Sequence, residues 1–352
     1  MKVLMIGPDS QAKGGIATVI QNFQTYFHYP DIDMFFLTTW QEGSKWNQFK
    51  TAMASYRKMR KTDVDIIHLH VAQKGSFFRK ALFLLGKRKN IPIILHMHAS
   101  SFDKFYNNSS KLVQRCIRLI FDRATCVVVL SEEWERFYKK LTNTEIKIIP
   151  NAVPIPSEYN YNPLATKIIT FGRIGKRKGS YDVLEVAKRI KARHPQYKFI
   201  LFGDGELDQV KKQIEEEHIE NVAIGGWVTD KEAIMKEAVL HFLPSYHEGL
   251  PMAILETMAA GIPNMASAVG GISQLVKTNE NGVLVEAGDT DMMVNELEQY
   301  LSNTNARNHL SENARKTIIE KFSIDTYNST WYKEYQMLEK FEKVCDVNES
   351  KV

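Results

Sequence analysis

The chain has 352 residues, of which 44% are hydrophobic and 25% are charged, a composition typical of a globular protein. This length is large for one hydrophobic core, so two domains are expected, and no apolar run approaches the roughly 20 residues that span a bilayer. Residues 1–150 contain 23 Lys and Arg against 12 Asp and Glu, a net charge of +11, whereas residues 151–352 carry −6. The basic half predicts that the first domain faces an anionic partner, either nucleic acid or an anionic membrane surface.

The start of the chain and its cysteines favour a cytoplasmic protein. Residues 1–7, Met-Lys-Val-Leu-Met-Ile-Gly, form a predicted first strand that is too short for a signal sequence. Cys116, Cys126 and Cys345 lack the spacing of metal ligands, which indicates thiols in a reducing compartment.

The first half of the chain alternates apolar runs of strand length with amphipathic segments. Strands are predicted at 3–6, 35–38, 65–70, 91–98, 126–130 and 146–149, and helices at 16–27, 47–60, 77–85, 109–121 and 132–140. This alternation predicts an α/β fold with a parallel, doubly wound sheet. The proline- and asparagine-rich residues 152–165 are the predicted linker between domains.

The second half repeats the alternation. Strands are predicted at 167–171, 197–202, 222–224, 238–243, 264–266 and 282–285, and helices at 181–193, 206–217, 230–238, 252–260, 272–276, 289–302 and 305–320. The tail at 325–343 is a predicted helix with apolar residues on one side. These are Tyr327, Trp331, Tyr335, Leu338 and Phe341, and their periodicity predicts that the helix packs on another element.

Residues 244–263 connect the strand at 238–243 through a loop to a short helix. Glu248 and Gly249 lie at the tip of the loop, and Pro251 suits the first position of the helix. The first amides of that helix and its macrodipole favour an anion such as a phosphate. Glu248 and Glu256 flank this position. Two carboxylates beside a phosphate suit a ligand with hydroxyls on both sides of a diphosphate, and a nucleotide sugar has this form.

Residues 248–256, Glu-Gly-Leu-Pro-Met-Ala-Ile-Leu-Glu, resemble the signature of retaining glycosyltransferases of family 4. Pro-Ser before it, Met-Ala-Ala-Gly-Ile-Pro after it and Gly270-Gly271 make the resemblance specific, and it runs from residue 1 to about residue 335. It implies the GT-B architecture, two Rossmann-like domains facing across a cleft. The implied acceptor-side domain covers residues 1–155, with the C-terminal helix at about 325–343 packed back on it, and the nucleotide-sugar-binding domain covers residues 163–322.

The loop at 172–179, Gly-Arg-Ile-Gly-Lys-Arg-Lys-Gly, follows the first strand of the second domain. The resemblance implies that Arg173 and Lys178 hold the donor diphosphate and stabilise the charge that grows on it as it leaves. It also implies that Glu248 binds sugar hydroxyls and that Glu256 binds the ribose. The other predicted donor-binding residues are Gly14, Gly15, Gly172, Gly203, Val228, Gly249, Leu250 and Pro251.

His98 ends the strand at 91–98, and the resemblance places it beside the transferred sugar. There its imidazole hydrogen-bonds the sugar or orients the acceptor. His98, Glu248, Arg173 and Lys178 are therefore the predicted catalytic residues. Ala99 follows His98 where the family usually has glycine or aspartate.

Two groups of residues raise the question of a metal. The histidines of two strands, His68, His70, His96 and His98, form either ordinary core contacts or a metal cluster. The pairs Asp31–Asp33 and Asp63–Asp65 match the Asp-x-Asp pattern of metal-dependent transferases, but they lie at the amino ends of predicted strands, away from the site. No metal and no other cofactor is expected.

The predicted enzyme is a glycosyltransferase of the hexosyl or N-acetylhexosaminyl class. It would take its sugar from a nucleotide-diphosphate sugar, UDP-linked, and pass it to a saccharide or lipid-linked oligosaccharide acceptor in surface, capsular or exopolysaccharide synthesis. The resemblance implies no nucleic-acid partner. The alternatives are a nucleotide-sugar epimerase, a phosphorylase with pyridoxal phosphate, and a non-catalytic partner with the same fold.

The segment at 77–85 bears on localisation. Its Phe77, Phe78, Leu82, Phe83 and Leu85 are accompanied by Arg79, Lys80, Lys87, Arg88 and Lys89. This pattern fits either a helix seated at an anionic membrane surface or a helix that packs on the core with solvated ends. The predicted location is the cytoplasm, and the first of these two patterns would add peripheral contact with the inner face of the plasma membrane.

Overall fold

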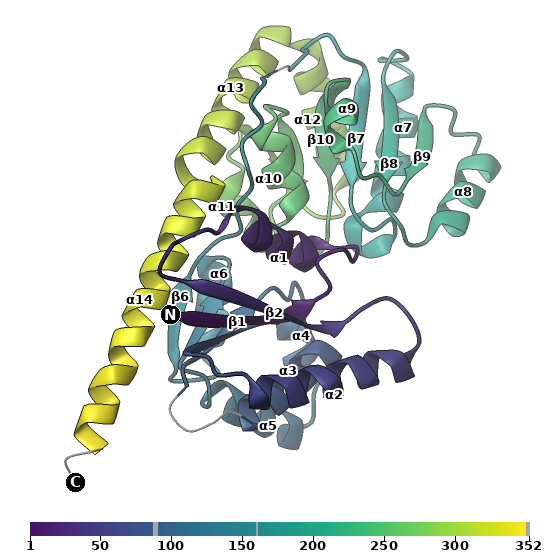
Figure 1. Ribbon diagram of the computed structural model, residues 1–352. Coiled ribbons are helices and arrows are strands. Elements are labelled where there is room, and N and C mark those ends of the chain that lie inside the picture. Colours follow the sequence, from purple (N-terminus) through teal and green to yellow (C-terminus); the bar gives the residue numbers. More distant parts are fainter. Residues whose placement is uncertain (87–90, 160, 350–352) are drawn as a thin grey trace. The chain divides into compact units, whose positions relative to one another are not determined.

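The computed structural model describes residues 1–86, 91–159 and 161–349, and the side chains of all of these except residues 45 and 341–349. The chain divides into two compact units (Figure 1). Unit 1 comprises Met1–Asn151 and Ile324–Val352, and unit 2 comprises Ala152–Ser323. Each unit contains a six-stranded parallel sheet, which confirms the predicted α/β class.

Unit 1 is built on a sheet with the strand order β2-β1-β3-β4-β5-β6, and all of its neighbours pair in parallel. The strands are β1 (Lys2–Pro8), β2 (Asp33–Trp40), β3 (Ile66–Val71), β4 (Ile93–Met97), β5 (Cys126–Val129) and β6 (Glu145–Ile148). The helices are α1 (Gly15–Tyr26), α2 (Lys45–Lys61), α3 (Gly75–Leu85), α4 (Phe102–Asn107), α5 (Lys111–Phe121), α6 (Glu132–Tyr138) and α14 (Ile324–Glu349).

The last helix, α14, packs on the sheet of unit 1. Trp331 and Tyr335 are fully buried, and the ring of Trp331 lies 4.4 Å from that of His68 on β3. Tyr327 and Trp331 also contact Phe23 of α1. The aromatic stripe predicted along the tail therefore meets β3 and α1, whereas the side chain of Phe341 lies outside the described residues.

Unit 1 contains one helix that was not predicted, and one prediction for a helix side chain is wrong. The predicted helix at 109–121 begins at Lys111, where the side chain of Ser110 accepts a hydrogen bond from the amide of Val113, and α4 precedes it. In α3, Lys80 does not belong to a cationic rim, because it is buried with 3% of its surface exposed. Lys87, Arg88 and Lys89, which were expected to extend that rim, lie outside the described residues.

Unit 2 repeats the design with the strand order β12-β11-β10-β7-β8-β9, again parallel throughout. The strands are β7 (Lys167–Phe171), β8 (Lys198–Phe202), β9 (Val222–Gly226), β10 (Ala238–Leu243), β11 (Asn264–Ser267) and β12 (Gly282–Val285). The helices are η1 (Lys176–Lys178), α7 (Ser180–Lys191), α8 (Leu207–Glu216), α9 (Lys231–Met235), α10 (Met252–Ala259), α11 (Ile272–Leu275), α12 (Thr290–Ser302) and α13 (Thr304–Lys321).

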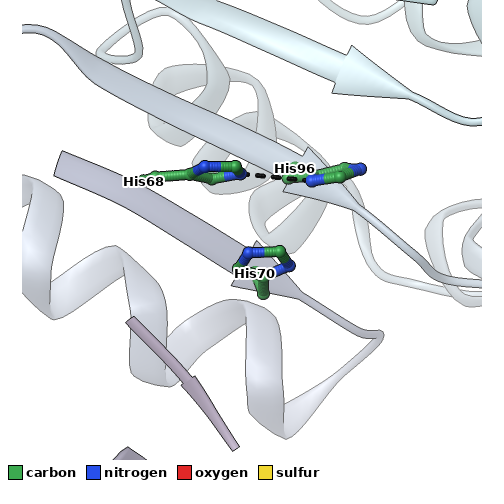
Figure 2. Close-up of side chains that lie close together, drawn as sticks. All are labelled: His68, His70 and His96. Carbon is green, nitrogen blue, oxygen red and sulfur yellow. Dashed lines mark hydrogen bonds between the residues drawn. The ribbon is translucent and has the colours of Figure 1, made fainter. Parts of the chain in front are cut away.

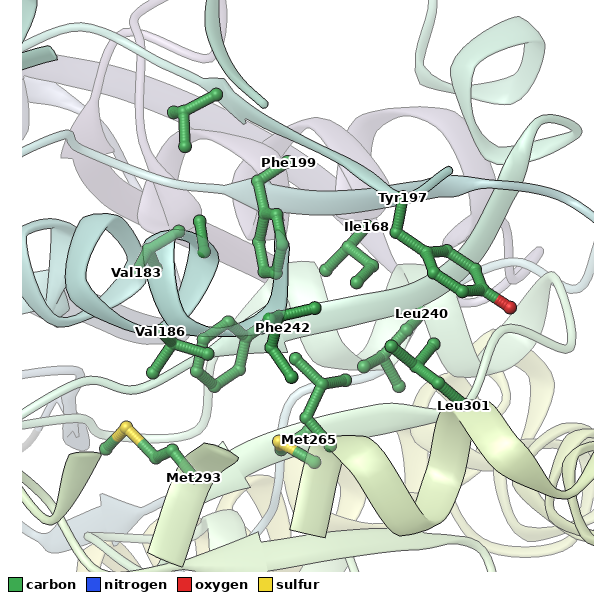
Figure 3. Close-up of a cluster of buried hydrophobic side chains, with 14 of the residues drawn as sticks. Ile168, Val183, Val186, Tyr197, Phe199, Leu240, Phe242, Met265, Met293 and Leu301 are labelled. Carbon is green, nitrogen blue, oxygen red and sulfur yellow. The ribbon is translucent and has the colours of Figure 1, made fainter. Parts of the chain in front are cut away.

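The core of unit 2 lies between this sheet and the helices α7 and α12 (Figure 3). Phe199 of β8 and Phe242 of β10 are fully buried there beside Val183 and Val186 of α7 and Met293 of α12. All six residues of β10 are buried, as expected for a central strand covered on both faces. This packing fixes the carboxyl ends of β7, β8 and β10, from which the functional loops extend.

No helix in the described part of the chain combines the length and apolarity needed to cross a bilayer. Cys126 is buried in β5 and Cys116 is exposed on α5. Cys345 falls where side chains are not described.

Candidate active site

The candidate donor site of unit 2 is assembled from loops that leave neighbouring parallel strands at the same edge of the sheet. The loop at 172–179 follows β7, the loop at 203–206 follows β8, and the loop at 244–251 follows β10. β10 pairs with β7, and β7 pairs with β8. Ligands of open α/β sheets bind at this carboxyl edge, so the topology brings the predicted donor residues together.

Lys178 and Glu248 form an ion pair, although 70 residues separate them in the chain. Their side chains are only 12% and 6% exposed, so this pair is held largely out of water. The two loops that carry them are also joined through Arg177. The Tyr246 amide donates a 2.9 Å hydrogen bond to the Arg177 carbonyl, and the Arg177 guanidinium donates to the His247 carbonyl at 3.2 Å. A lysine and a carboxylate are thereby fixed next to the start of α10.

The start of α10 differs slightly from the sequence prediction. Pro251 occupies the position before the helix rather than its first turn, and Met252 begins the helix. Gly249, Leu250 and Pro251, the last residues of this loop, are buried. Because α10 has no side-chain cap, its first amides are candidates for binding an anion, although the Ile254 amide already donates to the Pro251 carbonyl at 3.2 Å.

Several glycines of the site are required by the backbone of a neighbouring loop. A Cβ on Gly203 would lie 1.8 Å from the carbonyl oxygen of Gly172, and a Cβ on Gly179 would lie 2.0 Å from that of Pro244. A Cβ on Gly270 would lie 2.1 Å from the carbonyl oxygen of Glu248, which accounts for the second half of the family signature. Gly179, Gly203 and Gly270 are therefore required by packing, and this reason needs no ligand. At Gly172 the φ angle of 150° favours glycine.

Glu256 has a partner that the sequence did not reveal. The ammonium of Lys231 donates a 2.5 Å hydrogen bond to Oε2 of Glu256, and it lies 5.6 Å from the centre of the Phe171 ring. Lys231 is the first residue of α9, directly after Asp230, which caps that helix. Nothing in the local sequence distinguishes Lys231 from a solvated lysine, because its partner is 25 residues away.

Arg173 and Val228 border the site without entering these pairs. Arg173 is exposed, and its side chain lies along Gly205, where an added Cβ would be 3.1 Å from its Cγ. Val228 is half-buried against the apolar cluster of Phe171 and Phe202. Among the predicted donor residues of unit 2, the structure therefore couples Lys178 to Glu248, and leaves Arg173 at the solvent-facing rim.

A buried histidine supports the floor of the site. His241 of β10 accepts a hydrogen bond from the Phe171 amide at Nε2, 3.2 Å away, so its Nδ1 donates to Oδ1 of Asn264 at 2.5 Å. Burial lowers the pKa of His241 to about 4, and the imidazole is neutral. It ties β7, β10 and β11 together immediately below the loops.

The predicted residues of unit 1 lie at the carboxyl edge of its own sheet. Gly14 precedes α1 with φ of 128° and open space around it, a conformation that other residues rarely adopt. Gly15 is the first residue of α1. His98 follows β4 directly, donates its amide to the Val71 carbonyl at 2.8 Å and is partly exposed.

His68, His70, His96 and His98 form a contiguous group that we call the histidine layer. Figure 2 shows its three buried members, and one ring nitrogen of each lies within 4.8 Å of the others. Nε2 of His68 and Nδ1 of His96 share a 3.1 Å hydrogen bond, and Nδ1 of His70 and Nε2 of His98 share one of 3.0 Å. The hydroxyl of Tyr335 lies 2.7 Å from Nδ1 of His68.

The histidine layer is neutral. Burial, and next the neighbouring imidazoles, hold the pKa values of His68, His70 and His96 well below the usual range. Burial lowers the pKa of His98 to about 3. The nearby Lys80 is affected in the same way, because its burial lowers its pKa to about 7.

The aspartate pairs that match the Asp-x-Asp pattern lie at the opposite edge of this sheet. Asp33 begins β2, and Asp65 precedes β3. Oδ2 of Asp65 accepts the Lys2 amide at 2.7 Å, and Asp63 pairs with the Lys2 ammonium at 3.4 Å. Asp63 and Asp65 thus contact the first strand, and the position of the pairs at the amino ends of strands agrees with the sequence prediction.

Two family models match the chain in succession. The model for Glycosyltransferase Family 4 matches residues 14–155, and the model for Glycosyl transferases group 1 matches residues 156–317. The chain is a family 4 glycosyltransferase. It therefore transfers a sugar from a nucleotide-sugar donor.

Similar proteins agree with this assignment. This family 4 enzyme is 29% identical to the UDP-Gal:alpha-D-GlcNAc-diphosphoundecaprenol alpha-1,3-galactosyltransferase of Escherichia coli, over 78% of this chain and 76% of that protein. It is 25% identical to the 2-deoxystreptamine N-acetyl-D-glucosaminyltransferase of Niallia circulans, over 75% and 74% of the two chains. The structure of Anabaena HepE in complex with UDP and glucose superposes with a TM-score of 0.77 at 18% identity, over 96% and 100% of the chains. The fold is GT-B.

Proposed function

We propose that the protein is a retaining glycosyltransferase that moves a hexosyl or N-acetylhexosaminyl group from a UDP-sugar to a lipid-linked saccharide, in the synthesis of a surface polysaccharide. The observation that carries the donor half of the proposal is the buried pair of Lys178 and Glu248 beside the open start of α10. A diphosphate is bound by cations and backbone amides, and the hydroxyls of a sugar are bound by carboxylates. Here the cation of Lys178 and the carboxylate of Glu248 are hydrogen-bonded to each other.

The roles follow from the charges of the site. As the glycosidic bond breaks, negative charge grows on the β-phosphate, and Lys178 with the first amides of α10 stabilises it more than the ground state. Arg173 at the rim closes on the same diphosphate as a forked donor. Glu248 accepts hydrogen bonds from sugar hydroxyls, and Glu256, held by Lys231, accepts those of the ribose.

We propose that the reaction proceeds with retention and without a metal. Glu248 and Glu256 are each bound by a lysine, as binding groups would be, rather than arranged as an acid and a nucleophile around one bond. The acceptor would attack on the face from which the diphosphate leaves, with a phosphate oxygen taking its proton. Fixed cations supply the charge that a metal supplies in other transferases. Loss of turnover in EDTA with recovery in manganese would contradict this part.

A hollow in unit 1 supports a phosphate-bearing acceptor. It encloses about 390 Å³ and is lined by Gln73, Lys74, Ser101, Lys104, Phe105, Asn108 and Ser109, with two lysines and no carboxylate. Ser101 is three residues beyond His98, so the hollow begins near the proposed transfer point. Lys74 adopts φ of 49°, a strained conformation for a residue with a side chain. The similar Escherichia coli enzyme acts on a diphosphoundecaprenol-linked sugar.

The same region offers an apolar surface for a lipid. Phe78, Leu82 and Leu85 of α3 and Leu112 and Leu119 of α5 are 39% to 72% exposed. This half of the chain carries a net charge of +11, which suits peripheral contact with an anionic membrane. A cytoplasmic enzyme that reaches its lipid-linked acceptor at the inner membrane surface would need such a face.

The proposal is tested first at the donor site. UDP and UDP-sugars are expected to raise the melting temperature of the wild-type protein, while Lys178→Ala abolishes most of the shift and the neighbouring Lys176→Ala keeps it. No shift with any nucleotide, or equal shifts in both variants, would count against the donor site. Release of UDP should then depend on added acceptor, whereas an isomerised sugar nucleotide formed without acceptor would indicate an epimerase.

The acceptor half has its own measurement. Lys74→Ala and Lys104→Ala should raise the KM for a phosphate-bearing acceptor and leave the KM of the donor unchanged, and the exposed Lys140→Ala serves as the control. Unchanged acceptor KM in both variants would remove the hollow from the acceptor site.

A further inference from the structure

In the histidine layer, His98 is partly exposed, and His70 is hydrogen-bonded to His98. β3 and β4 pair with His70 opposite His96, and alternation places His68, His70 and His96 on one face of the sheet. His68 is held by Tyr335 and His96, whereas the ring of His70 is hydrogen-bonded to His98. Figure 2 shows the hydrogen bond between His68 and His96, with His70 beside this pair, and the ring of His70 stacks on that of His68 with the ring centres 4.5 Å apart. The rings of His70 and His98 are stacked, with centres 5.1 Å apart and planes at 15°.

Each neutral imidazole carries one N–H, so the bond between Nδ1 of His70 and Nε2 of His98 has two possible directions. If His98 donates, His70 must carry its own proton at Nε2. That atom is buried and has no hydrogen-bond partner among the described residues. If His70 donates, only a lone pair is left unpaired at Nε2. Buried N–H groups without a partner are rarer in native proteins than acceptors without one, and this difference favours His70 as the donor.

We propose that His70 donates its Nδ1–H to Nε2 of His98 and thereby fixes His98 as the tautomer with its proton on Nδ1. His70 is then a positioning residue for the proposed transfer, and this inference rests on the role proposed for His98. His98 would offer a neutral N–H to an oxygen of the sugar or its phosphate. It would act as a hydrogen-bond donor and would not remove the proton of the acceptor.

The layer could in principle hold a metal, since three of its nitrogens lie within 4.8 Å of one another. The donor set contains no carboxylate or thiolate, and Lys80 is buried close enough to lower the pKa of His70 further. A dication among neutral ligands and beside a lysine would have little charge compensation. The hydrogen-bonded arrangement is therefore the one that the surroundings favour.

The test reads the tautomers directly by ¹⁵N nuclear magnetic resonance of histidine-labelled protein, with His98→Gln to assign the signals. In the wild type, His98 is expected to show a protonated Nδ1. In His70→Asn, the side-chain amide N–H takes the position of the Nδ1–H of histidine. In His70→Gln, the amide N–H takes the position of Nε2 instead. The Nδ1–H form of His98 should persist in the Asn variant and be lost in the Gln and Ala variants. A protonated Nε2 on wild-type His98 would overturn the proposal.

Turnover gives an independent readout. His70→Gln and His70→Ala should lower kcat about tenfold, the loss expected when one oriented hydrogen bond disappears, and His70→Asn should restore most of it. The rate of the wild type should not titrate with His98 between about pH 6 and pH 9, because the imidazole stays neutral there. Equal kcat in the Asn and Gln variants would show that His70 does not position His98.

Two controls separate the possible failures. Wild-type turnover in His98→Ala would remove His98 from the proposed function, while the tautomer measurement would still stand or fall by itself. One zinc per chain in the purified protein, with metal-shifted nitrogen signals from His68, His70 and His96, would overturn the hydrogen-bonded layer. If His70→Ala does not fold, the Asn and Gln pair and the wild-type spectrum still decide the question.

Discussion

In unit 2, the carboxyl edge of the sheet holds charges in pairs, whereas in unit 1 the same edge holds neutral imidazoles. Lys178 pairs with Glu248, and Lys231 pairs with Glu256, so each carboxylate is held in a fixed direction. The histidine layer instead remains uncharged because burial removes the water that would solvate a proton. A charged edge suits an anionic donor with many hydroxyls. A neutral edge suits the proposed transfer of a sugar to its acceptor beside an uncharged imidazole.

The largest expected effect of this difference is on stability in acid. Unfolded histidines have a pKa near 6.5 and those of the layer lie far lower, so below pH 6.5 the unfolded chain binds more protons than the folded one. Each buried histidine then costs about 1.4 kcal/mol of unfolding free energy for each pH unit. Unit 1, with three fully buried members, should unfold at a higher pH than unit 2, where His241 is the histidine with a lowered pKa of about 4.

Tryptophan fluorescence can follow this unfolding, because four of the five tryptophans belong to unit 1 and only Trp227 belongs to unit 2. His96→Leu should move the acid midpoint of the fluorescence change to lower pH. The exposed His28→Leu, in the same unit, should leave it unchanged. Identical midpoints in wild type and His96→Leu would show that the layer does not control the acid stability.

The next largest effect is expected from Lys178→Ala. If Lys178 meets the departing diphosphate, its removal should cost about 2–4 kcal/mol of transition-state stabilisation, or about 30- to 1,000-fold in kcat/KM. Lys176→Ala changes an exposed lysine of the same loop and should have little effect. Steady-state kinetics on the two variants measures the difference, and a similar loss in both would assign it to the loop rather than to Lys178.

Glu248→Gln tests the other half of the same pair. The amide keeps the shape but replaces charge-assisted hydrogen bonds to the sugar, so kcat should fall about 10- to 100-fold while the melting temperature changes little. Circular dichroism and turnover should be measured on one preparation. Full turnover in a folded Glu248→Gln protein would take Glu248 out of the site.

A smaller effect is expected from Lys231→Ala. Glu256 would lose the ammonium that orients it, and the KM of the donor should rise by about three- to tenfold with kcat nearly unchanged. Lys236→Ala removes a half-exposed lysine from the end of the same helix and is the matched control. A fall in kcat with constant KM would mean that Lys231 acts on the leaving group instead of on Glu256.

The smallest effect is expected at the apolar surface of unit 1. Leu82→Ser with Leu85→Ser should weaken binding to phosphatidylglycerol vesicles at low salt, and raised salt should weaken the wild type as well. Leu164→Ser, which changes a more exposed leucine in unit 2, should bind as the wild type does. Vesicle sedimentation measures this, and no binding by the wild type would leave α3 without a membrane role.

The sequence predicted most of the fold, and the structure brings together two of the residues predicted for the donor site, Lys178 and Glu248. The sequence predicted the strand at 238–243, the loop with Glu248 and the helix ended by Gly261, because strand burial, turn residues and helix caps are local properties. The sequence did not predict that Lys231 is the partner of Glu256, since this contact depends on how the segments that follow β9 and β10 are placed in the fold. α4 was missed because six residues give too short a pattern to distinguish from a loop.

The histidine layer shows a different limit. Strand alternation placed His68 with His70 and His96 with His98, but which nitrogen meets which depends on the register between β3 and β4. Tyr335, which meets His68, is 267 residues away along the chain. Lys80 is a similar case, because a lysine in an amphipathic helix is ordinarily solvated and here it lies beneath Thr39 with its ammonium bonded to the hydroxyl.

The close approach of glycines at the donor site restricts how this enzyme could acquire a new donor. Main chain contacts main chain where Gly179 meets Pro244, Gly203 meets Gly172 and Gly270 meets Glu248, at the loops of the candidate donor site. Random mutagenesis at these glycines would mostly yield misfolded protein. A library aimed at altered sugar preference should therefore spare them and vary exposed or half-exposed side chains such as Arg173 and Trp227 around the opening.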